Sequence, residues 1–332
     1  MKLAFLFPGQ GAQAVGMGQA LAERFPIARH VFETADRALG YRLSDLCWKG
    51  PVEELRKTVH TQPALLTHSV AAWKLLDAAG VKPSWVAGHS LGEYSACVAA
   101  GALDFEDAVR LVHRRGELMY RAGIDRPGTM AAILGLERAQ VEEACARAEA
   151  AGVVCPANLN APGQVVISGE RAAVVRACEL ARGMGAKRVI PLEVSGAFHS
   201  PLMGSAAAGL TEALAAVSVH DALVPVVANV SGEPLRRGPE IRAALEAQLL
   251  GAVRWEDSMR RLIADGAQGF VEAGTGTVLR GLLRTLDKSV PSWSVDDPDG
   301  LQATLSALTG AAGDVAGGAP LTGDSEPMEE AG

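Results

Sequence analysis

The chain has 332 residues, of which 48% are hydrophobic and 21% charged, and its formal net charge is −7. This length is enough for one large folded body with a sizeable core, and the negative charge argues against nucleic acid as a partner. The five cysteines are scattered without a C-x-x-C pair, which predicts reduced thiols in the cytoplasm. Pro8 breaks the N-terminal apolar run, so the run is too short for a signal peptide or a membrane span.

The first third of the chain alternates apolar runs with helical patterns. Residues 2–7 (KLAFLF) and 84–89 (SWVAGH) are predicted to be buried strands, and residues 61–80 and 91–101 are predicted to be helices. This alternation predicts a parallel sheet covered by helices. A further helix is predicted over residues 104–123, where Asp104 is a good N-cap.

The middle of the chain has a different order of elements. Its patterns predict β, α, β, β, α and β in succession over about residues 126–194, with a hairpin turn at residues 161–163. This order is typical of a ferredoxin-like unit. The patterns of the body then resume with a helix over 200–217, strands over 224–232 and 269–274, and a helix over 277–287.

The predicted fold class is therefore α/β, with a hydrolase-like parallel-sheet core and an inserted ferredoxin-like (βαββαβ) subdomain. Residues 1–125 and 195–309 would form the core, and residues 126–194 the subdomain. Residues 310–332 are rich in Gly, Ala, Pro and acidic residues and have little to bury, which predicts a disordered acidic tail.

A G-x-S-x-G motif, "GHSLG", lies at residues 88–92 between a predicted strand and a predicted helix. In this setting the serine is held on a sharp turn with its Oγ exposed, and the glycines remove side chains that would collide across the turn. The helix N-terminus adds free N–H groups and a positive dipole end. An N-capping serine is the structural alternative, but the strand before and the helix after favour Ser90 as a nucleophile.

A serine nucleophile needs a base, and the sequence offers seven histidines. Four of them lie inside helical patterns and fit structural or solvated roles: His30, His60, His68 and His113. His89 adjoins the serine and should point elsewhere on the turn, while His220 next to Asp221 is a second candidate. His199 lies in a loop between a predicted strand and a helix, where sites in α/β sheets collect. The small residues 195–197 leave room beside it, which favours His199.

Arg115 falls in the middle of an apolar stripe on the predicted helix 104–123. An unpaired buried charge costs several kcal/mol or more, so this guanidinium needs a partner. An internal salt bridge or snorkelling is the structural alternative. The functional hypothesis is a substrate carboxylate held by the planar fork, which together with a serine nucleophile suggests transfer of a dicarboxylic half-ester acyl group.

Four motifs occur in order along the chain: "FPGQGAQ" (7–13), "GHSLGE" (88–93), "RRGELM" (114–119) and "SGAFHS" (195–200). On these motifs the sequence resembles the malonyl-CoA:acyl carrier protein transacylase family from Lys2 to about Leu308. The resemblance implies a free-standing S-malonyltransferase of fatty-acid or polyketide synthesis, and both pathways stay open. The ferredoxin-like insertion also fits the fold of this family.

The resemblance also implies roles for particular residues. These are Ser90 and His199 as catalytic nucleophile and general base, the backbone N–H groups of Gln10 and Leu91 as the oxyanion hole, Arg115 and Phe198 as substrate-binding residues, and the backbone carbonyl of Gln248 as the group that orients the histidine. Phe198 resembles members that take malonyl rather than methylmalonyl units. Ala252 and Thr275 stand where the family often has proline.

The implied reaction is ping-pong transfer from malonyl-CoA to the phosphopantetheine thiol of an acyl carrier protein. No bound cofactor and no metal are implied, and the glycines at 9, 11, 16 and 18 do not fit a dinucleotide fingerprint. The expected partners are malonyl-CoA and an acyl carrier protein, with no nucleic acid and no membrane. We expect a cytoplasmic monomer.

Three alternatives remain at this point. An ordinary esterase or lipase would have its histidine in a late loop, whereas the last histidine here, His220, precedes over a hundred further residues. A hydrolase of the same fold that clears acyl groups from carrier proteins would have no use for Arg115 with neutral acyl chains. A non-catalytic docking module for carrier proteins would not need both Ser90 and His199.

Overall fold

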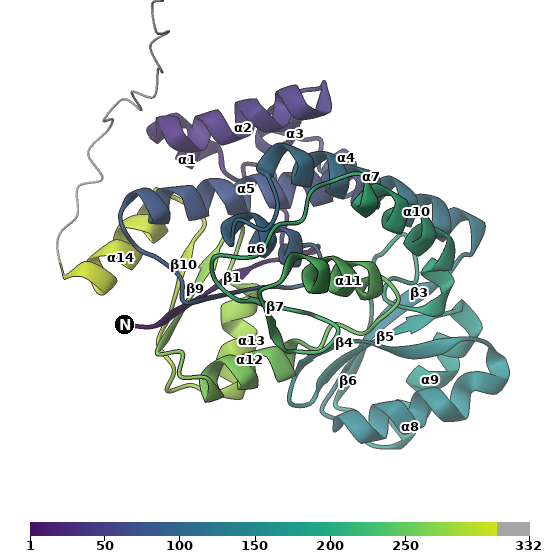
Figure 1. Ribbon diagram of the computed structural model, residues 1–332. Coiled ribbons are helices and arrows are strands. Elements are labelled where there is room, and N and C mark those ends of the chain that lie inside the picture. Colours follow the sequence, from purple (N-terminus) through teal and green to yellow (C-terminus); the bar gives the residue numbers. More distant parts are fainter. Residues whose placement is uncertain (311–332) are drawn as a thin grey trace, which may run out of the picture.

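The computed structural model describes residues 1–310, and the described chain forms two β-sheets (Figure 1). The larger sheet has the order β10-β9-β1-β2-β7-β8, and its neighbouring strands are parallel except for β7 and β8. Its strands are β1 (Leu3–Phe7), β2 (Trp85–Gly88), β7 (Val226–Val227), β8 (Pro234–Leu235), β9 (Gly269–Ala273) and β10 (Ser292–Val295). The smaller sheet is antiparallel in the order β4-β5-β3-β6, with strands β3 (Thr129–Leu134), β4 (Val154–Ala161), β5 (Gln164–Gly169) and β6 (Arg188–Pro191).

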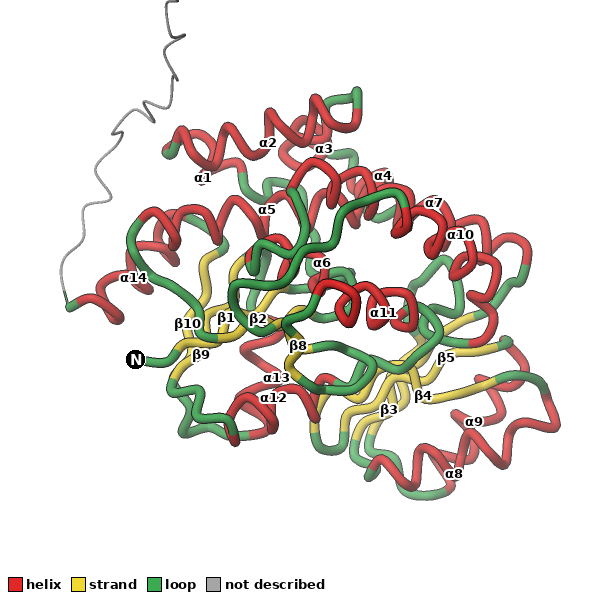
Figure 2. The backbone as a smooth tube through the Cα atoms, in the orientation of Figure 1, coloured by secondary structure: helices red, strands yellow, loops and turns green. Residues whose placement is uncertain are grey.

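Helices flank both sheets, as the tube view in Figure 2 shows. They are α1 (Gln19–Arg24), α2 (Pro26–Leu39), α3 (Leu43–Lys49), α4 (Val52–Leu55), α5 (Thr58–Ala78), α6 (Gly92–Ala99), α7 (Phe105–Asp125), α8 (Arg138–Ala148), α9 (Arg171–Gly183), α10 (Gly204–Ala215), α11 (Gly238–Gln248), α12 (Trp255–Ala264), α13 (Val278–Leu286) and α14 (Pro298–Thr309). The predicted α/β class, a parallel-sheet core with an added antiparallel sheet, is confirmed. The predicted tail, 310–332, lies outside the described residues except for Gly310.

The central strand β1 is buried on both faces. Leu3, Phe5 and Phe7 point into a core shared with α2 and α5, whereas Ala4 and Leu6 point into a second core shared with α12 and α13. Figure 1 shows α5 on one side of this sheet and α12 and α13 on the other. A parallel strand covered by helices on both faces needs a continuous apolar run, which is what residues 2–7 provide.

The predicted βαββαβ unit is present as β3-α8-β4-β5-α9-β6. Strands β4 and β5 form the predicted hairpin, in which Ala161 pairs with Gln164 across the turn. The unit has its own apolar core, to which Ile133, Val141 and Val174 contribute. A separate core supports treating residues 126–194 as a subdomain, but the proposed boundaries stay a prediction.

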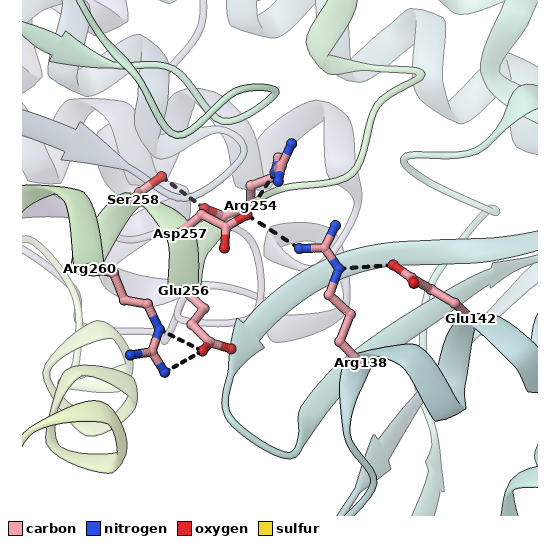
Figure 3. A network of polar contacts seen from close by, with 7 residues as sticks. All are labelled: Arg138, Glu142, Arg254, Glu256, Asp257, Ser258 and Arg260. Carbon is pink, nitrogen blue, oxygen red and sulfur yellow. Dashed lines mark hydrogen bonds and ion pairs between the residues drawn. The ribbon is translucent and has the colours of Figure 1, made fainter.

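The subdomain is joined to the larger body along β4. The Leu159 N–H donates to the Val253 carbonyl and the Val253 N–H donates to the Ala157 carbonyl, both at 2.8 Å. Nearby, Arg138 of α8 and Arg254 both contact the Asp257 carboxylate, at 3.3 and 2.7 Å (Figure 3). The Arg138 and Asp257 side chains are 44% and 33% exposed, and exposed ion pairs contribute little, so the backbone hydrogen bonds should stabilise this junction more than the ion pair does.

Candidate active site

The G-x-S-x-G motif forms the turn between β2 and α6. Ser90 has a φ of 51°, in the left-handed region that a residue with a side chain rarely adopts. A Cβ on Gly88 would collide with the backbone of Gly92, and a Cβ on Gly92 would collide with the Phe7 carbonyl of β1. The glycines therefore allow a turn tight enough to raise Ser90 above the carboxyl ends of the strands.

This steric argument predicts the effect of adding one methyl group. Gly92→Ala should lower stability by about 1–3 kcal/mol or more, because the new Cβ overlaps backbone atoms that cannot move aside. Gly281→Ala in α13 is the matched control, since a Cβ there meets open space; it should leave stability unchanged or raise it by up to about 1 kcal/mol. Thermal unfolding of both variants tests this, and equal melting temperatures would contradict it.

The nucleophile candidate and the favoured histidine are in direct contact. The Ser90 hydroxyl donates to His199 Nε2 at 2.8 Å. On the other side of the ring, Nδ1 faces the backbone carbonyls of Gln248 and Gly251 at 3.0 and 3.1 Å. Because these carbonyls only accept, we assign the proton to Nδ1, which leaves Nε2 free to accept from the serine.

His199 is held neutral by its surroundings. Burial and, secondarily, the positive charge of Arg115 lower the pKa of His199 to about 3. An unprotonated imidazole is therefore available as a base at neutral pH. The second candidate, His220, is exposed and does not line the cavity beside Ser90.

Arg115 is buried, as its position in the apolar stripe predicts, with 1% of its surface exposed. Its guanidinium donates to the side-chain oxygens of Gln62 at 2.8 Å and Gln248 at 2.9 Å, and to Ser90 Oγ at 3.2 Å. Within residues 1–310 no carboxylate lies in salt-bridge range of Arg115, and its Nε finds no acceptor. The internal salt bridge weighed as an alternative is thus not present in the described chain.

A small cavity of about 110 Å³ opens at the serine. Ser90, His199 and Arg115 form part of its polar lining. Its apolar lining comes from Met119, Met130, Leu192, Val194 and Phe198. The cavity thus offers a short acyl group one reactive hydroxyl, one cation and apolar walls.

Gln10 and Leu91 also line this cavity. Among the described residues, neither of their backbone N–H groups donates a hydrogen bond. An oxyanion hole requires two N–H groups beside the serine hydroxyl that donate to no other acceptor. The structure thus brings together all seven residues that the sequence singled out, with Gln248 in contact behind the cavity; their roles stay proposals.

A protein-family model for the acyl transferase domain matches residues 4–311. The chain belongs to the acyl transferase family. A relative from Bacillus subtilis (strain 168), malonyl CoA-acyl carrier protein transacylase, is 47% identical over 308 residues, which covers 92% of this chain and 97% of the relative. The predicted resemblance to that family of transacylases is therefore confirmed.

Two solved structures are similar to this acyl transferase throughout. The malonyl CoA-acyl carrier protein transacylase from Coxiella burnetii has a TM-score of 0.90 at 41% identity and covers 93% of this chain and 98% of its own. A malonyl-transacylase in complex with a type II PKS acyl-carrier protein has a TM-score of 0.89 at 42% identity, with coverage of 94% and 100%.

The sequence did not reveal several residues that support the acyl transferase site. Asn229 accepts from the Ser90 N–H and donates to the Gly88 carbonyl, both at 2.7 Å. Asn160, whose Oδ1 contacts His89 at 2.8 Å, was also not revealed, although His89 itself points away from the serine as predicted. Asn229 interrupts the apolar run of residues 224–230, and a buried amide in such a run is a signal that could have been used.

Two kinds of feature are missing from the described part of this acyl transferase. No group of three or more His, Cys, Asp or Glu side chains within residues 1–310 is placed to hold a metal ion. Over the same residues, no helix combines the length and apolar character needed to cross a membrane.

Proposed function

We propose that this acyl transferase moves a malonyl group from malonyl-CoA to the phosphopantetheine thiol of an acyl carrier protein, through an ester on Ser90. The observation that carries the proposal is the buried guanidinium of Arg115, which contacts Ser90 Oγ at 3.2 Å and has no carboxylate within salt-bridge distance in the described chain. A dicarboxylic acyl group bound at Ser90 would supply a carboxylate in direct contact with this guanidinium.

The first half-reaction loads the enzyme. Ser90 Oγ attacks the thioester carbonyl carbon while His199 Nε2 takes the hydroxyl proton. The backbone N–H groups of Gln10 and Leu91 stabilise the oxyanion. The C–S bond then breaks, CoA leaves as the thiol with the proton from His199, and the malonyl group remains on Ser90.

The second half-reaction unloads it. The phosphopantetheine thiol gives its proton to His199 and attacks the ester carbonyl. The bond to Ser90 Oγ breaks, and the oxygen recovers the proton from His199. The backbone carbonyls of Gln248 and Gly251 hold the ring in one tautomer throughout, so no acidic residue is needed behind the histidine.

Substrate size would be set by the apolar wall. Phe198 precedes the base, is buried and lines the cavity. In a cavity of about 110 Å³ an additional methyl branch on the acyl group would crowd this ring. We propose that Phe198 favours malonyl over methylmalonyl units.

We also propose a cytoplasmic location. All five cysteines are free in the structure, and four of them are buried. Free thiols fit a reducing compartment.

Intact mass spectrometry after incubation with malonyl-CoA tests the proposed function. Wild-type protein should gain one malonyl group on the peptide that contains Ser90, and holo-acyl carrier protein should remove it. Ser90→Ala should gain none. Ser95→Ala, which removes a buried hydroxyl without a partner from α6, the helix that follows Ser90, should react as the wild type does.

Two outcomes would contradict the proposal. A malonyl adduct that persists in Ser90→Ala would place the nucleophile elsewhere. Release of free malonate, without malonyl appearing on the carrier protein, would indicate the hydrolase instead.

A further inference from the structure

Gln248 contacts Ser90, His199 and Arg115, three residues of the proposed catalytic site. Its backbone carbonyl accepts from His199 Nδ1 at 3.0 Å, and its side-chain Oε1 accepts from Arg115 at 2.9 Å. Its Nε2 donates to the Ser90 carbonyl at 2.9 Å and to a carboxylate oxygen of Glu93 at 2.7 Å. One residue therefore contacts the nucleophile and the arginine through its side-chain amide and the base through its backbone carbonyl.

The orientation of this amide follows from its neighbours. Arg115 can only donate, so it must face Oε1, whereas the Ser90 carbonyl and the ionised Glu93 carboxylate can only accept, so they must face Nε2. A flipped amide would bring its NH₂ group against the guanidinium and its oxygen against two acceptors. The Arg115 guanidinium and the Glu93 carboxylate are both charged, and hydrogen bonds to charged groups are the strong ones.

Glu93 is buried at the start of α6, with 2% of its surface exposed. Besides Gln248, the same oxygen, Oε2, accepts from the Asn229 N–H at 3.2 Å. Asn229 in turn holds the Ser90 N–H at 2.7 Å. Glu93 thus anchors both the amide that holds Arg115 and the residue that holds the nucleophile turn.

We propose that Glu93 is a positioning residue of this site. Its carboxylate fixes the Gln248 amide and Asn229, and through them it holds Ser90 and Arg115 in the positions that acyl transfer requires. The inference rests on the proposed function of the same site. Glu93 itself does not line the cavity, so it acts through its neighbours and not on the substrate.

The charge state of Glu93 gives the proposal a pH signature. Burial raises the pKa of Glu93 to about 7, against the lowering effects of Gln248, Asn229 and the charge of Arg115 on α7. On its own helix the carboxyl is near the side chains of Tyr94 and Cys97, whose pKa values burial raises further above neutrality. Transfer should therefore weaken as the pH falls through about 7, where Glu93 gains a proton, whereas His199, with its pKa lowered to about 3, stays neutral there.

The same shift separates positioning from a purely structural role. A carboxyl with a raised pKa binds its proton more tightly in the folded chain than in the unfolded chain. As the pH rises above the pKa that this carboxyl has in the unfolded chain, its ionisation therefore lowers the free energy of unfolding. Because glutamine carries no charge, Glu93→Gln should then leave the melting temperature at pH 8 unchanged or raise it. Loss of activity without loss of stability is the expected result.

The test measures kcat and KM for malonyl transfer to holo-acyl carrier protein between pH 5.5 and 8.5. Glu93→Gln should lose about 10- to 100-fold in kcat/KM at pH 8, mainly in kcat, and its profile should be flat near pH 7. Glu93→Asp, which keeps the charge on a shorter side chain, should recover part of the loss. Glu272→Gln is the matched control, because that carboxyl is also buried, with its pKa raised to about 7, but it holds the N–H groups of Leu279 and Arg280 in α13.

Glu272→Gln should keep the wild-type kcat/KM and pH profile. A second readout uses a fluorophosphonate probe, which labels activated serines without regard to the acyl group; Glu93→Gln should slow labelling of Ser90. Failure of the wild type to transfer malonyl would overturn the proposed function, whereas labelling still tests Glu93. The inference would be overturned if Glu93→Gln kept the wild-type kcat/KM, pH profile and labelling rate. It would also be overturned if Glu272→Gln lost as much activity as Glu93→Gln and both variants had lower melting temperatures.

Discussion

His199→Ala is expected to slow acylation of the enzyme by malonyl-CoA by about 10²–10⁴-fold, the usual contribution of a positioned general base. The Ser90 hydroxyl donates to Nε2 at 2.8 Å, and carbonyls on the other side of the ring keep the proton on Nδ1. Since burial lowers the pKa of His199 to about 3, wild-type imidazole is already unprotonated at pH 6–8, so the loss should be nearly constant over that range. Rapid-quench measurement of the malonyl-enzyme gives the rate directly.

His220→Ala is the control for this prediction. That histidine is exposed, and the contact made by its backbone N–H, to the Ala102 carbonyl, does not involve the ring. It should acylate at the wild-type rate, and both variants should be compared at temperatures well below their melting points. A large loss in His220→Ala with little change in His199→Ala would move the base to the other histidine.

Local patterns were enough to predict the sheets that carry the site. The run at residues 2–7 is apolar throughout because β1 is buried on both faces, and such a run between helices is typical of a parallel strand. Residues 161–163 predicted the β4–β5 hairpin because an Ala-Pro-Gly sequence between two strand patterns fits a tight turn. The spacing of glycines around Ser90 likewise has a local steric cause.

Contacts between segments that lie far apart in the sequence could not be predicted from local patterns. Asn229 reaches the Ser90 N–H across 139 positions of sequence, and Gln62 reaches Arg115 across 53. The pattern over 224–232 predicted a strand, but only Val226–Val227 belong to β7; Asn229 lies beyond it, where its amide holds the serine turn. The apolar stripe around Arg115 predicted that the guanidinium is buried. Its two amide partners, Gln62 and Gln248, come from other helices, so the sequence pattern of α7 alone could not predict them.

Arg115→Ala is expected to abolish the preference of the enzyme for malonyl-CoA over acetyl-CoA. A charge-assisted contact between the guanidinium and the malonyl carboxylate contributes roughly 1.5–3 kcal/mol, which corresponds to about 10- to 150-fold in kcat/KM. Acetyl-CoA lacks that carboxylate, so the wild type should use it poorly. Without the guanidinium, kcat/KM for malonyl-CoA should fall by this factor, while kcat/KM for acetyl-CoA should stay the same or rise.

Two further variants decide whether this effect comes from the carboxylate. Arg115→Lys should restore only part of the malonyl rate, because an ammonium cannot present the planar fork that also reaches Gln62 and Gln248. Arg114→Ala removes the neighbouring arginine, whose side chain is 55% exposed and pairs with Glu117, and should leave both activities unchanged. If Arg115→Ala lowers the malonyl and acetyl rates equally and also lowers the melting temperature, the arginine holds the fold together and does not select the acyl group.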